Sequence, residues 1–135
     1  MTPAGYSGTP LPEKLGIKDG DTVVVVDGPD AVDIPATTTR LPSEPATADV
    51  IVFFTTERAR LERELGTLRR AMTPSAGLWI AWPKKASKVP TDMTEDVVRE
   101  VALPTGLVDN KVCAIDETWS GLRLVIRKEL RGDPR

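Results

Sequence analysis

The chain contains no histidine, and this absence excludes more chemistry than any motif in it suggests. Without imidazole there is no Ser-His-Asp triad, no Cys-His pair, no histidine-ligated zinc and no ordinary proton shuttle near neutral pH. Cys113 is the only cysteine, so an internal disulfide and a cluster of several thiolates are excluded as well. We therefore expect no metal site.

Strong charge of one sign and long apolar runs are also missing. The 18 basic and 20 acidic residues give a formal net charge of −2 and form no large block, which argues against a nucleic-acid binder. No stretch approaches the roughly 18 apolar residues of a membrane span, and no basic segment followed by an apolar run opens the chain. These features predict a soluble cytoplasmic protein that binds neither nucleic acid nor membrane.

The composition that remains is typical of a globular domain. Of 135 residues, 40% are hydrophobic and 28% charged, which predicts a single domain over residues 1–135 with one core. Residues 1–20 are expected to form an N-terminal arm with a short helix, capped by Thr9 and starting at Pro10. The charged tail, residues 129–135, is expected to fray.

Three apolar runs predict strands that are covered on both faces. Residues 22–26 read Thr-Val-Val-Val-Val, residues 49–54 read Asp-Val-Ile-Val-Phe-Phe, and residues 78–82 read Leu-Trp-Ile-Ala-Trp. Trp79 and Trp82 lie three apart, so they are expected to cover opposite sides of the sheet. The connection 27–48 has no helical period, and residues 37–41 within it are predicted as a short edge strand.

Two helices and a hairpin complete the prediction. Residues 57–72 form an amphipathic helix after a Thr55-Thr56 cap, and residues 92–103 form a second helix, which Asp92 caps. Strands 111–115 and 122–128 are joined by residues 116–121 as an antiparallel pair. The order of elements predicts an α/β fold with a Rossmann-like, mostly parallel sheet flanked by helices and an antiparallel C-terminal hairpin strand.

From residue 50 onward, this order resembles the second half of a Rossmann-like methyltransferase, whose final hairpin inserts its last strand antiparallel into the sheet. Residues 23–26 correspond to that fold's first strand. The family has a glycine-rich turn after this strand, whereas this chain has Asp27-Gly28-Pro29-Asp30, in which the proline removes an amide donor. The resemblance implies a degenerate methyltransferase-like fold. We expect no cofactor, with S-adenosylmethionine as the alternative.

Short strings along the chain are similar to a small bacterial family of unknown function, the domain of unknown function numbered three thousand and fifty-two. The strings are GYSGTPL at residues 5–11, WPKK at 82–85, TED at 94–96, VDNKVC at 108–113 and TWSGL at 118–122. That family implies no activity, substrate or catalytic residue. The resemblance therefore supports the fold and leaves the function open.

Open α/β sheets bind ligands outside the carboxyl ends of their parallel strands, which selects residues 27–28, 55–56, 84–85 and 116–119. The lysines beside Ser87 are suited to an anionic ligand, and Thr55 and Thr56 offer hydroxyls and helix N-terminal amides. The candidate ligand-binding residues are Thr55, Thr56, Lys84, Lys85, Ser87, Asp92, Asp116 and Trp119, and no catalytic residue is assigned.

Each candidate also has a purely structural interpretation. The lysines of a proline-flanked loop are often simply solvated, threonines and Asp92 cap helices, and Asp116 forms turns. Either aspartate is alternatively a general base, and Trp119 either stacks on a ligand ring or covers the core. Cys113 lies in an apolar strand, where a thiol is expected to be an inert packing group.

Two functions are compatible with this sequence. The preferred one is a non-catalytic binding or scaffolding protein with a degenerate cofactor loop, acting through a protein partner or a small anionic ligand. The alternative is a transferase-type, methyltransferase-like enzyme that uses the C-terminal edge of the sheet. A homodimer stays open, because exposed sheet edges often pair. Asp109, Asn110 and Lys111 fit a pocket, a strand-edge network or a subunit contact equally well.

Overall fold

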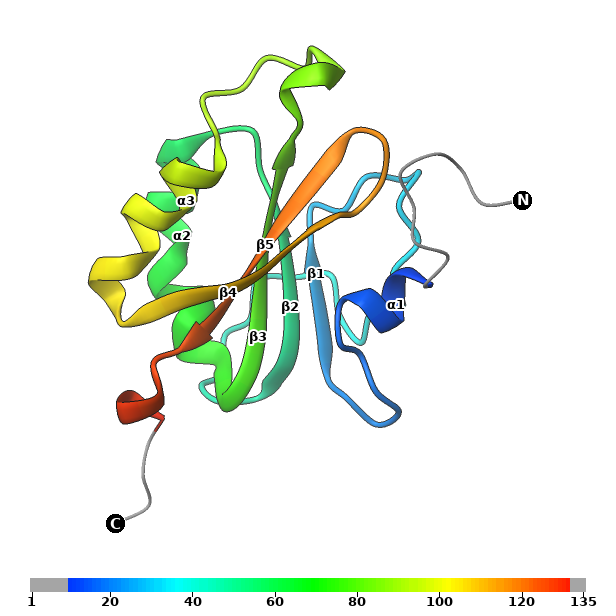
Figure 1. Ribbon diagram of the computed structural model, residues 1–135. Coiled ribbons are helices and arrows are strands. Elements are labelled where there is room, and N and C mark those ends of the chain that lie inside the picture. The colour runs from blue at the N-terminus through cyan, green and yellow to red at the C-terminus, as the bar shows by residue number, and fades with distance from the viewer. Residues whose placement is uncertain (1–9, 132–135) are drawn as a thin grey trace.

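The computed structural model describes residues 10–131, which form a five-stranded sheet with helices on both faces (Figure 1). The strands are β1 (Val23–Val26), β2 (Ala48–Phe54), β3 (Met72–Pro83), β4 (Leu107–Ala114) and β5 (Trp119–Ile126). The α-helices are α1 (Leu11–Lys14), α2 (Arg58–Ala71) and α3 (Glu95–Ala102), and the 3-10 turns are η1 (Lys85–Ser87), η2 (Leu103–Thr105) and η3 (Lys128–Leu130).

The strand order is β1-β2-β3-β5-β4. The first three strands are parallel to one another, and β5 runs antiparallel to both of its neighbours, β3 and β4. Four of the five strands formed by residues 10–131 therefore point the same way, and the hairpin places its last strand inside the sheet. The predicted Rossmann-like α/β fold, with its mostly parallel sheet and antiparallel C-terminal hairpin strand, is confirmed.

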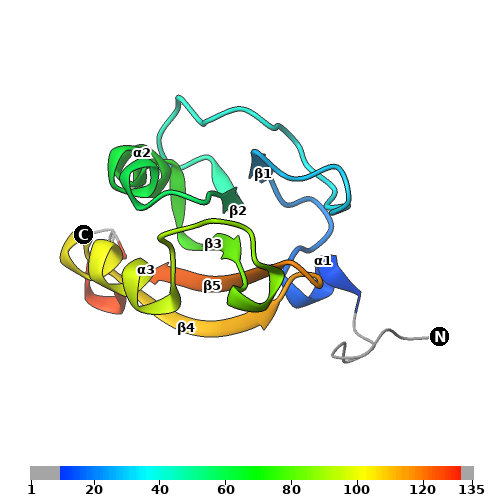
Figure 2. The same ribbon diagram turned by 90° about the horizontal axis from the view of Figure 1, so that it is seen from above.

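The two faces of the sheet have separate apolar cores. Figure 2 shows α2 and α3 on one face and α1 on the other. On the first face, Leu61, Leu65 and Leu68 of α2 pack on alternate residues of β2, β3 and β5. On the second, Leu15 and the connection after β1 cover the other alternate residues. Because both faces are covered, the central strands are apolar throughout, as parallel strands commonly are.

Trp79 and Trp82 lie in different cores, so the prediction that they cover opposite sides of the sheet is confirmed. Trp79 is fully buried under α1, and its indole N–H donates to the Leu15 carbonyl at 3.0 Å. This bond satisfies a donor that would otherwise be buried without a partner. It also fixes the end of α1 on the sheet, although α1 has only four residues.

The boundaries of several elements differ from those predicted. Strand β3 begins at Met72, directly where α2 ends, so residues 73–77 belong to the strand rather than to a loop. Strand β4 begins at Leu107, because a bulge at Asn110, between Asp109 and Lys111, accommodates residues that have the character of a loop. The edge strand predicted at 37–41 is a single parallel bridge between Val24 and Thr38.

The helix starts also differ. Helix α3 begins at Glu95, and its N-cap is Thr94, whose hydroxyl accepts a hydrogen bond from the Val97 amide at 3.1 Å. The prediction that Asp92 caps this helix is wrong, because Asp92 accepts from the amide of Arg58 at 2.8 Å and so caps α2. The N-cap of α2 is Glu57 rather than Thr55 or Thr56.

Both ends of the described segment are tied to the sheet. The residue before α1 is Pro10, and the predicted cap Thr9, with the string at residues 5–9, lies outside the described residues. At the other end η3 follows β5, and Arg131 donates from Nε to the Ile126 carbonyl at 2.9 Å. None of the helices formed by residues 10–131 has the length and apolar composition needed to cross a membrane.

Two glycines allow a matched test of this packing. A Cβ built at Gly121 of β5 would lie 3.0 Å from Ile115 Cδ1 and 3.1 Å from Trp79 Cε3, whereas one at Gly66 of α2 would meet nothing within 4 Å. We expect Gly121→Val to lower the free energy of unfolding by about 1–3 kcal/mol through overpacking. Gly66→Ala is expected to raise it by about 0.5–1 kcal/mol through helix propensity.

Urea denaturation of both variants measures these changes. Equal effects of the same sign would contradict the packing described for β5.

Candidate functional site

The carboxyl ends of β1, β2 and β3 meet at one edge of the sheet. From β1 the chain first crosses to one side, where Thr38 pairs in parallel with Val24, and then returns to the other side to form β2. Strand β1 therefore has parallel neighbours on both sides, and the direction of the connections reverses there. Such a reversal is the place where α/β sheets bind ligands.

A pocket of about 270 Å³ lies where β1 and β2 end, and we call it the β1–β2 pocket. Phe54 and Trp119 form an aromatic wall, with ring centroids 5.2 Å apart in an edge-to-face arrangement. The remaining lining residues are Asp27, Thr55, Thr56, Glu57 and Arg60. The structure thus brings together three of the predicted candidates, Thr55, Thr56 and Trp119.

Several polar groups of the β1–β2 pocket already have partners within the protein. Arg60 forms an ion pair with Asp27, and its guanidinium carbon lies 5.0 Å from the centre of the Phe53 ring. The Thr55 hydroxyl accepts from the Glu57 amide at 3.0 Å and donates to the Glu57 carbonyl at 3.2 Å. These contacts order the strand-to-helix turn. Glu57 also lines the pocket, and its carboxylate has no hydrogen-bond or ion-pair partner within residues 10–131.

A second pocket, of about 400 Å³, lies on the other side of the same edge, and we call it the β3–α3 pocket. Its apolar residues include Trp82 and Met93, both buried in the core that α2 and α3 cover. The rest of its lining is Pro83, Lys84, Lys85, Thr91, Thr94, Glu95 and Ser120. The predicted candidates are therefore divided between two pockets on opposite sides of the sheet edge.

The charge of the β3–α3 pocket is set by its two lysines. Glu95 forms an ion pair with Arg99, so its carboxylate is already neutralised. Within residues 10–131, neither Lys84 nor Lys85 has a hydrogen-bond or ion-pair partner on its ammonium group. Lys84 is half-buried and Lys85 is exposed. The pocket therefore combines an apolar floor with an uncompensated positive rim.

The loop from η1 to α3 is hydrogen-bonded to the residues at the start of α2, and so it links the two pockets. Thr91 donates from its hydroxyl to the Thr56 carbonyl at 2.7 Å, and Asp92 accepts from the Arg58 amide at 2.8 Å. Ser87 donates to the Lys84 carbonyl at 2.6 Å, which closes the η1 turn. Ser87 and Asp92 line neither pocket, because their side chains bond to backbone within this loop and to the start of α2.

Asp116 has a structural role in the hairpin. One carboxylate oxygen accepts from the amides of Thr118 and Trp119 at 2.8 and 2.7 Å, which is the geometry of an aspartate-stabilised turn. The side chain lines neither of the two pockets. Its interpretation as a turn former therefore explains every contact the carboxylate makes.

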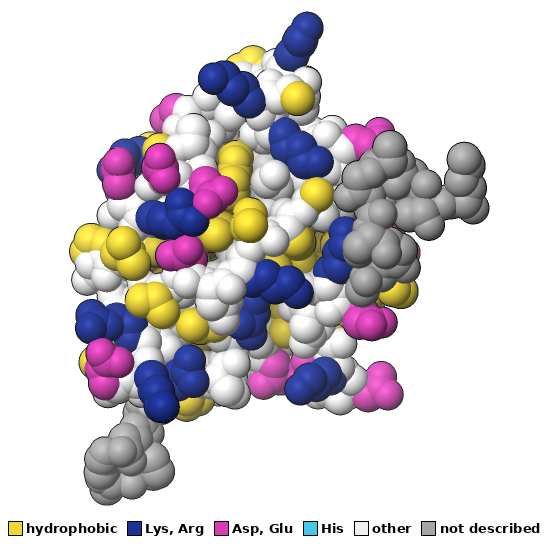
Figure 3. Space-filling view, viewed as in Figure 1, with side chains coloured by type: hydrophobic (Ala, Val, Ile, Leu, Met, Phe, Trp, Pro, Cys, Tyr) yellow, Lys and Arg dark blue, Asp and Glu magenta, His cyan; other side chains and the backbone are white. Residues whose placement is uncertain are grey.

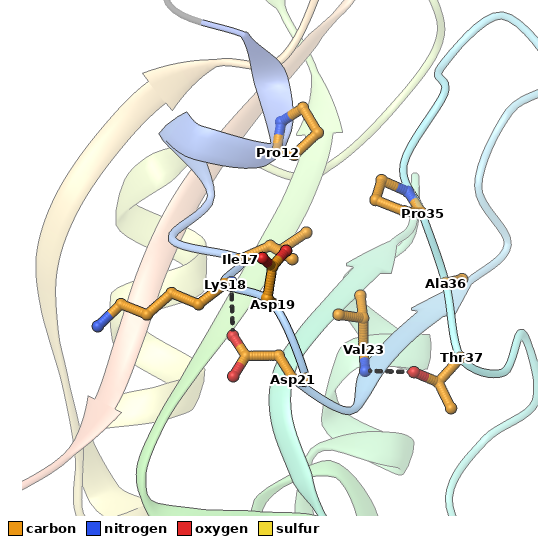
Figure 4. Close-up of a pocket in the computed structure, with 10 residues that line it drawn as sticks. Pro12, Ile17, Lys18, Asp19, Asp21, Val23, Pro35, Ala36 and Thr37 are labelled. Atoms are coloured by element: carbon orange, nitrogen blue, oxygen red, sulfur yellow. Dashed lines mark hydrogen bonds between the residues drawn. The ribbon is translucent and has the colours of Figure 1, made fainter.

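A third pocket, of about 460 Å³, lies at the opposite, amino end of β1. Figure 4 shows Asp21 and Thr37 bonded to nearby backbone, with the Lys18 side chain pointing away. The Asp21 carboxylate accepts from the Lys18 amide at 2.8 Å, and the Thr37 hydroxyl accepts from the Val23 amide at 3.0 Å. This pocket lies away from the strand ends at which α/β sheets bind ligands.

Several residues of the two pockets were not among the candidates from the sequence. Arg60 of α2 and Ser120 of β5 belong to elements whose apolar pattern hides their place at the sheet edge, and Met93 lies in the loop before α3. Trp82 was identified as a strand residue, and its position at the end of that strand is the signal that marks it as a pocket residue. Glu95 lies in the first turn of α3, which the structure places beside Lys84 and Lys85.

Comparison with known proteins identifies the fold. No family model matches the chain, and no curated protein matches it. Among solved structures, a SAM-dependent methyltransferase from Aquifex aeolicus has a TM-score of 0.58 at 16% identity, covering 84% of this chain and 87% of its own. A putative type 11 methyltransferase from Sulfolobus solfataricus has a TM-score of 0.59 at 14% identity, covering 87% and 90%.

A further similar structure is LepI in complex with SAM, with a TM-score of 0.55 at 12% identity. It covers 87% of this chain and 39% of its own chain. At these identities the similarity establishes a methyltransferase-like Rossmann fold for this chain and says nothing further about its chemistry.

The hydrogen bond by which Asp92 caps α2 contributes to the free energy of unfolding, and this contribution can be measured. We expect Asp92→Ala to lower the free energy of unfolding by about 1 kcal/mol, because the Arg58 amide loses its acceptor at the helix start. The control is Asp19→Ala, at an exposed loop residue that makes no side-chain hydrogen bond within residues 10–131. Equal urea midpoints for the two variants would show that the bond to Arg58 does not stabilise α2.

The pKa of the Cys113 thiol depends on how deeply the thiol is buried on the α1 face of the sheet. Burial raises the pKa of its thiol, and the positive charges of Lys14 and Lys111 oppose this effect only in part. The thiolate therefore forms at higher pH in the folded protein than in the unfolded chain, where the pKa is about 8.5. The stability that this shift contributes is fully present below that pH and is lost as the pH rises through the folded pKa.

We expect iodoacetamide to alkylate folded Cys113 with a pH profile displaced upward from that of the urea-unfolded protein. Mass spectrometry of samples quenched over a pH series measures it, and the single cysteine makes the assignment unambiguous. Coincident profiles would contradict the burial of the thiol.

Proposed function

We propose that this protein is a non-catalytic binding protein for a small amphipathic anion, which it holds in the β3–α3 pocket. The observation that supports this most directly is the pairing of a buried apolar floor, Trp82 and Met93, with the unpaired ammonium groups of Lys84 and Lys85. Small-molecule sites typically combine such an apolar lining with a few polar groups that fix the orientation of the ligand.

The anionic group of the ligand would lie between the two lysines. Lys84 is half-buried, so its charge is less screened than a fully solvated one and gains more from an anionic partner. The apolar part of the ligand would lie against Trp82, where removing apolar surface from water stabilises the complex. Ser120 and Thr94 add hydroxyl groups at the rim, both suited to accept or donate a hydrogen bond.

Four carboxylates at this edge are engaged in bonds within the protein, which supports binding without turnover. Among the described residues at this edge, the Asp27 and Glu95 carboxylates are paired with arginines, and those of Asp92 and Asp116 accept from backbone amides. A general base has to be within hydrogen-bond reach of the proton it removes. A carboxylate held in one of these roles would have to break its ion pair or hydrogen bond before it could act as a general base.

Octanoate tests this proposal, with octanol as its uncharged counterpart. We expect octanoate to raise the melting temperature, since a ligand at a hundred times its Kd stabilises the folded state by about 2.7 kcal/mol. Octanol is expected to bind at least tenfold more weakly. The double variant Lys84→Gln/Lys85→Gln should lose the preference for octanoate, whereas Lys128→Gln, at an exposed lysine beyond β5, should keep it.

Recovery of octanoate unchanged after prolonged incubation, measured by mass spectrometry, is the expected sign of binding without turnover. Equal binding of octanoate to the double variant and to the Lys128→Gln protein would refute the assignment to Lys84 and Lys85.

A second candidate function is that of a transferase that uses S-adenosylmethionine. It is supported by the likeness to methyltransferases and to a structure that contains SAM. Its site would be the β1–β2 pocket, where Trp119 and Phe54 offer an aromatic wall and Asp27 lies at the turn after β1. Within that pocket the Asp27 carboxylate is held by Arg60, so cofactor binding would compete with this ion pair.

Isothermal titration with S-adenosylmethionine distinguishes the two candidates. Binding that weakens at least tenfold in Trp119→Ala and is unchanged in the Lys84→Gln/Lys85→Gln variant would establish the transferase candidate and place its cofactor in the β1–β2 pocket. No heat of binding, together with octanoate binding at the lysines, would leave only the binding protein.

A further inference from the structure

A second group of cations lies around Arg123 of β5, away from both pockets of the carboxyl edge. Arg123 is in the middle of β5, and Lys111 of β4 is its direct cross-strand neighbour. Arg131 comes directly after η3, five residues after Ile126 at the end of β5, and its positive charge acts on Arg123. In Figure 3, Lys and Arg side chains are spread over the visible surface among Asp and Glu side chains, and some of them lie near its middle.

The guanidinium of Arg123 is held close to the backbone of β3. Arg123 pairs with Trp79 across the strands, so its side chain lies on the α1 face. A Cβ built at Gly77, two residues before Trp79, would lie 2.6 Å from Nε and 2.9 Å from Nη2 of Arg123. The guanidinium therefore occupies the space that a side chain at position 77 would fill, which fixes it on the sheet.

This guanidinium has no counter-ion in the described part of the chain. Arg99 shows the usual arrangement, with ion pairs to Glu95, Asp96 and Asp109. Arg123 is half-buried, yet within residues 10–131 no carboxylate or carbonyl accepts a hydrogen bond from it. Burial and the nearby charge of Arg131 lower the pKa of Arg123. A partly desolvated charge without a partner destabilises the folded state, and an anion would remove that penalty.

We propose that Arg123, with Arg131 and Lys111 beside it, forms a binding site for the oxyanion group of a small ligand, a phosphate or a carboxylate. The planar guanidinium presents two parallel N–H donors, which match both groups in a bidentate arrangement. Arg131 has its Nε bonded to the Ile126 carbonyl, which leaves its Nη groups to share the anion. Lys111 is the cross-strand neighbour of Arg123 on the same face, and its ammonium donates to the Lys14 carbonyl at 3.3 Å.

This site is separate from the β3–α3 pocket. Arg123 lies on the α1 face, whereas Trp82 and Met93 belong to the core under α2 and α3. The two proposals therefore succeed or fail independently. The Lys84→Gln/Lys85→Gln protein is expected to retain oxyanion binding at Arg123, and an Arg123 variant is expected to retain the preference for octanoate over octanol.

Titration with inorganic phosphate and with acetate, at an ionic strength held constant with sodium chloride, tests the site. We expect saturable binding of at least one of them, measured by the melting temperature and by the side-chain Nε–H signal of Arg123 in 15N NMR. Arg123→Gln should weaken that binding at least tenfold. Arg40→Gln removes the same charge from an exposed arginine in the connection after β1, and it should leave the affinity unchanged.

Phosphate binding that exceeds acetate binding would identify a phosphoryl ligand, and the reverse order would identify a carboxylate ligand. If Arg123→Gln does not fold, Arg123→Lys and Arg131→Gln take its place. Arg123→Lys keeps the positive charge but loses the bidentate N–H donors of the guanidinium. Equal affinity in the Arg123 and Arg40 variants would overturn the proposal. So would a response to phosphate and acetate no greater than that to chloride.

Discussion

The burial of β2 and β3 on both faces is the constraint on which the rest of the molecule depends. Every residue of β2 except Asp49 is buried, and β3 is buried from Ala76 to Pro83. Such strands form only if two independent layers cover them, and the chain supplies one layer with α2 and α3 and the other with α1 and the connection after β1. Because the second layer has so little helix, the bond from Trp79 to Leu15 fixes its position.

The same constraint places the polar chemistry at the ends of the strands. At the carboxyl edge, the hydroxyls and carboxylates of Thr55, Ser87, Asp92 and Asp116 bond to backbone. These bonds order the loops that follow the buried strands. The ammonium groups of Lys84 and Lys85, after β3, take no part in these bonds, and the binding proposal rests on them.

The apolar runs were sufficient to predict the fold, whereas the caps and the site depended on contacts between distant residues. The strands around residues 23–26, 49–54 and 78–82 and the helix after residue 57 follow from apolar pattern alone. Asp92 and Thr94 each precede α3 with a side chain suited to capping, and only the tertiary contact with Arg58 decides that Asp92 serves α2. Likewise, no local pattern indicates that Thr55 and Trp119, 64 positions apart in the sequence numbering, line one pocket.

The bulge in β4 has a consequence for how the protein behaves at high concentration. Strand β4 is the outer strand on its side of the sheet, so its free backbone groups could recruit a strand from another molecule. The bulge turns Asp109 toward Arg99 and Lys111 toward Arg123, on opposite faces. An added strand would lose its register at Asn110 and meet a charge on either side of it. These features oppose edge-to-edge pairing of this strand with a strand of another molecule.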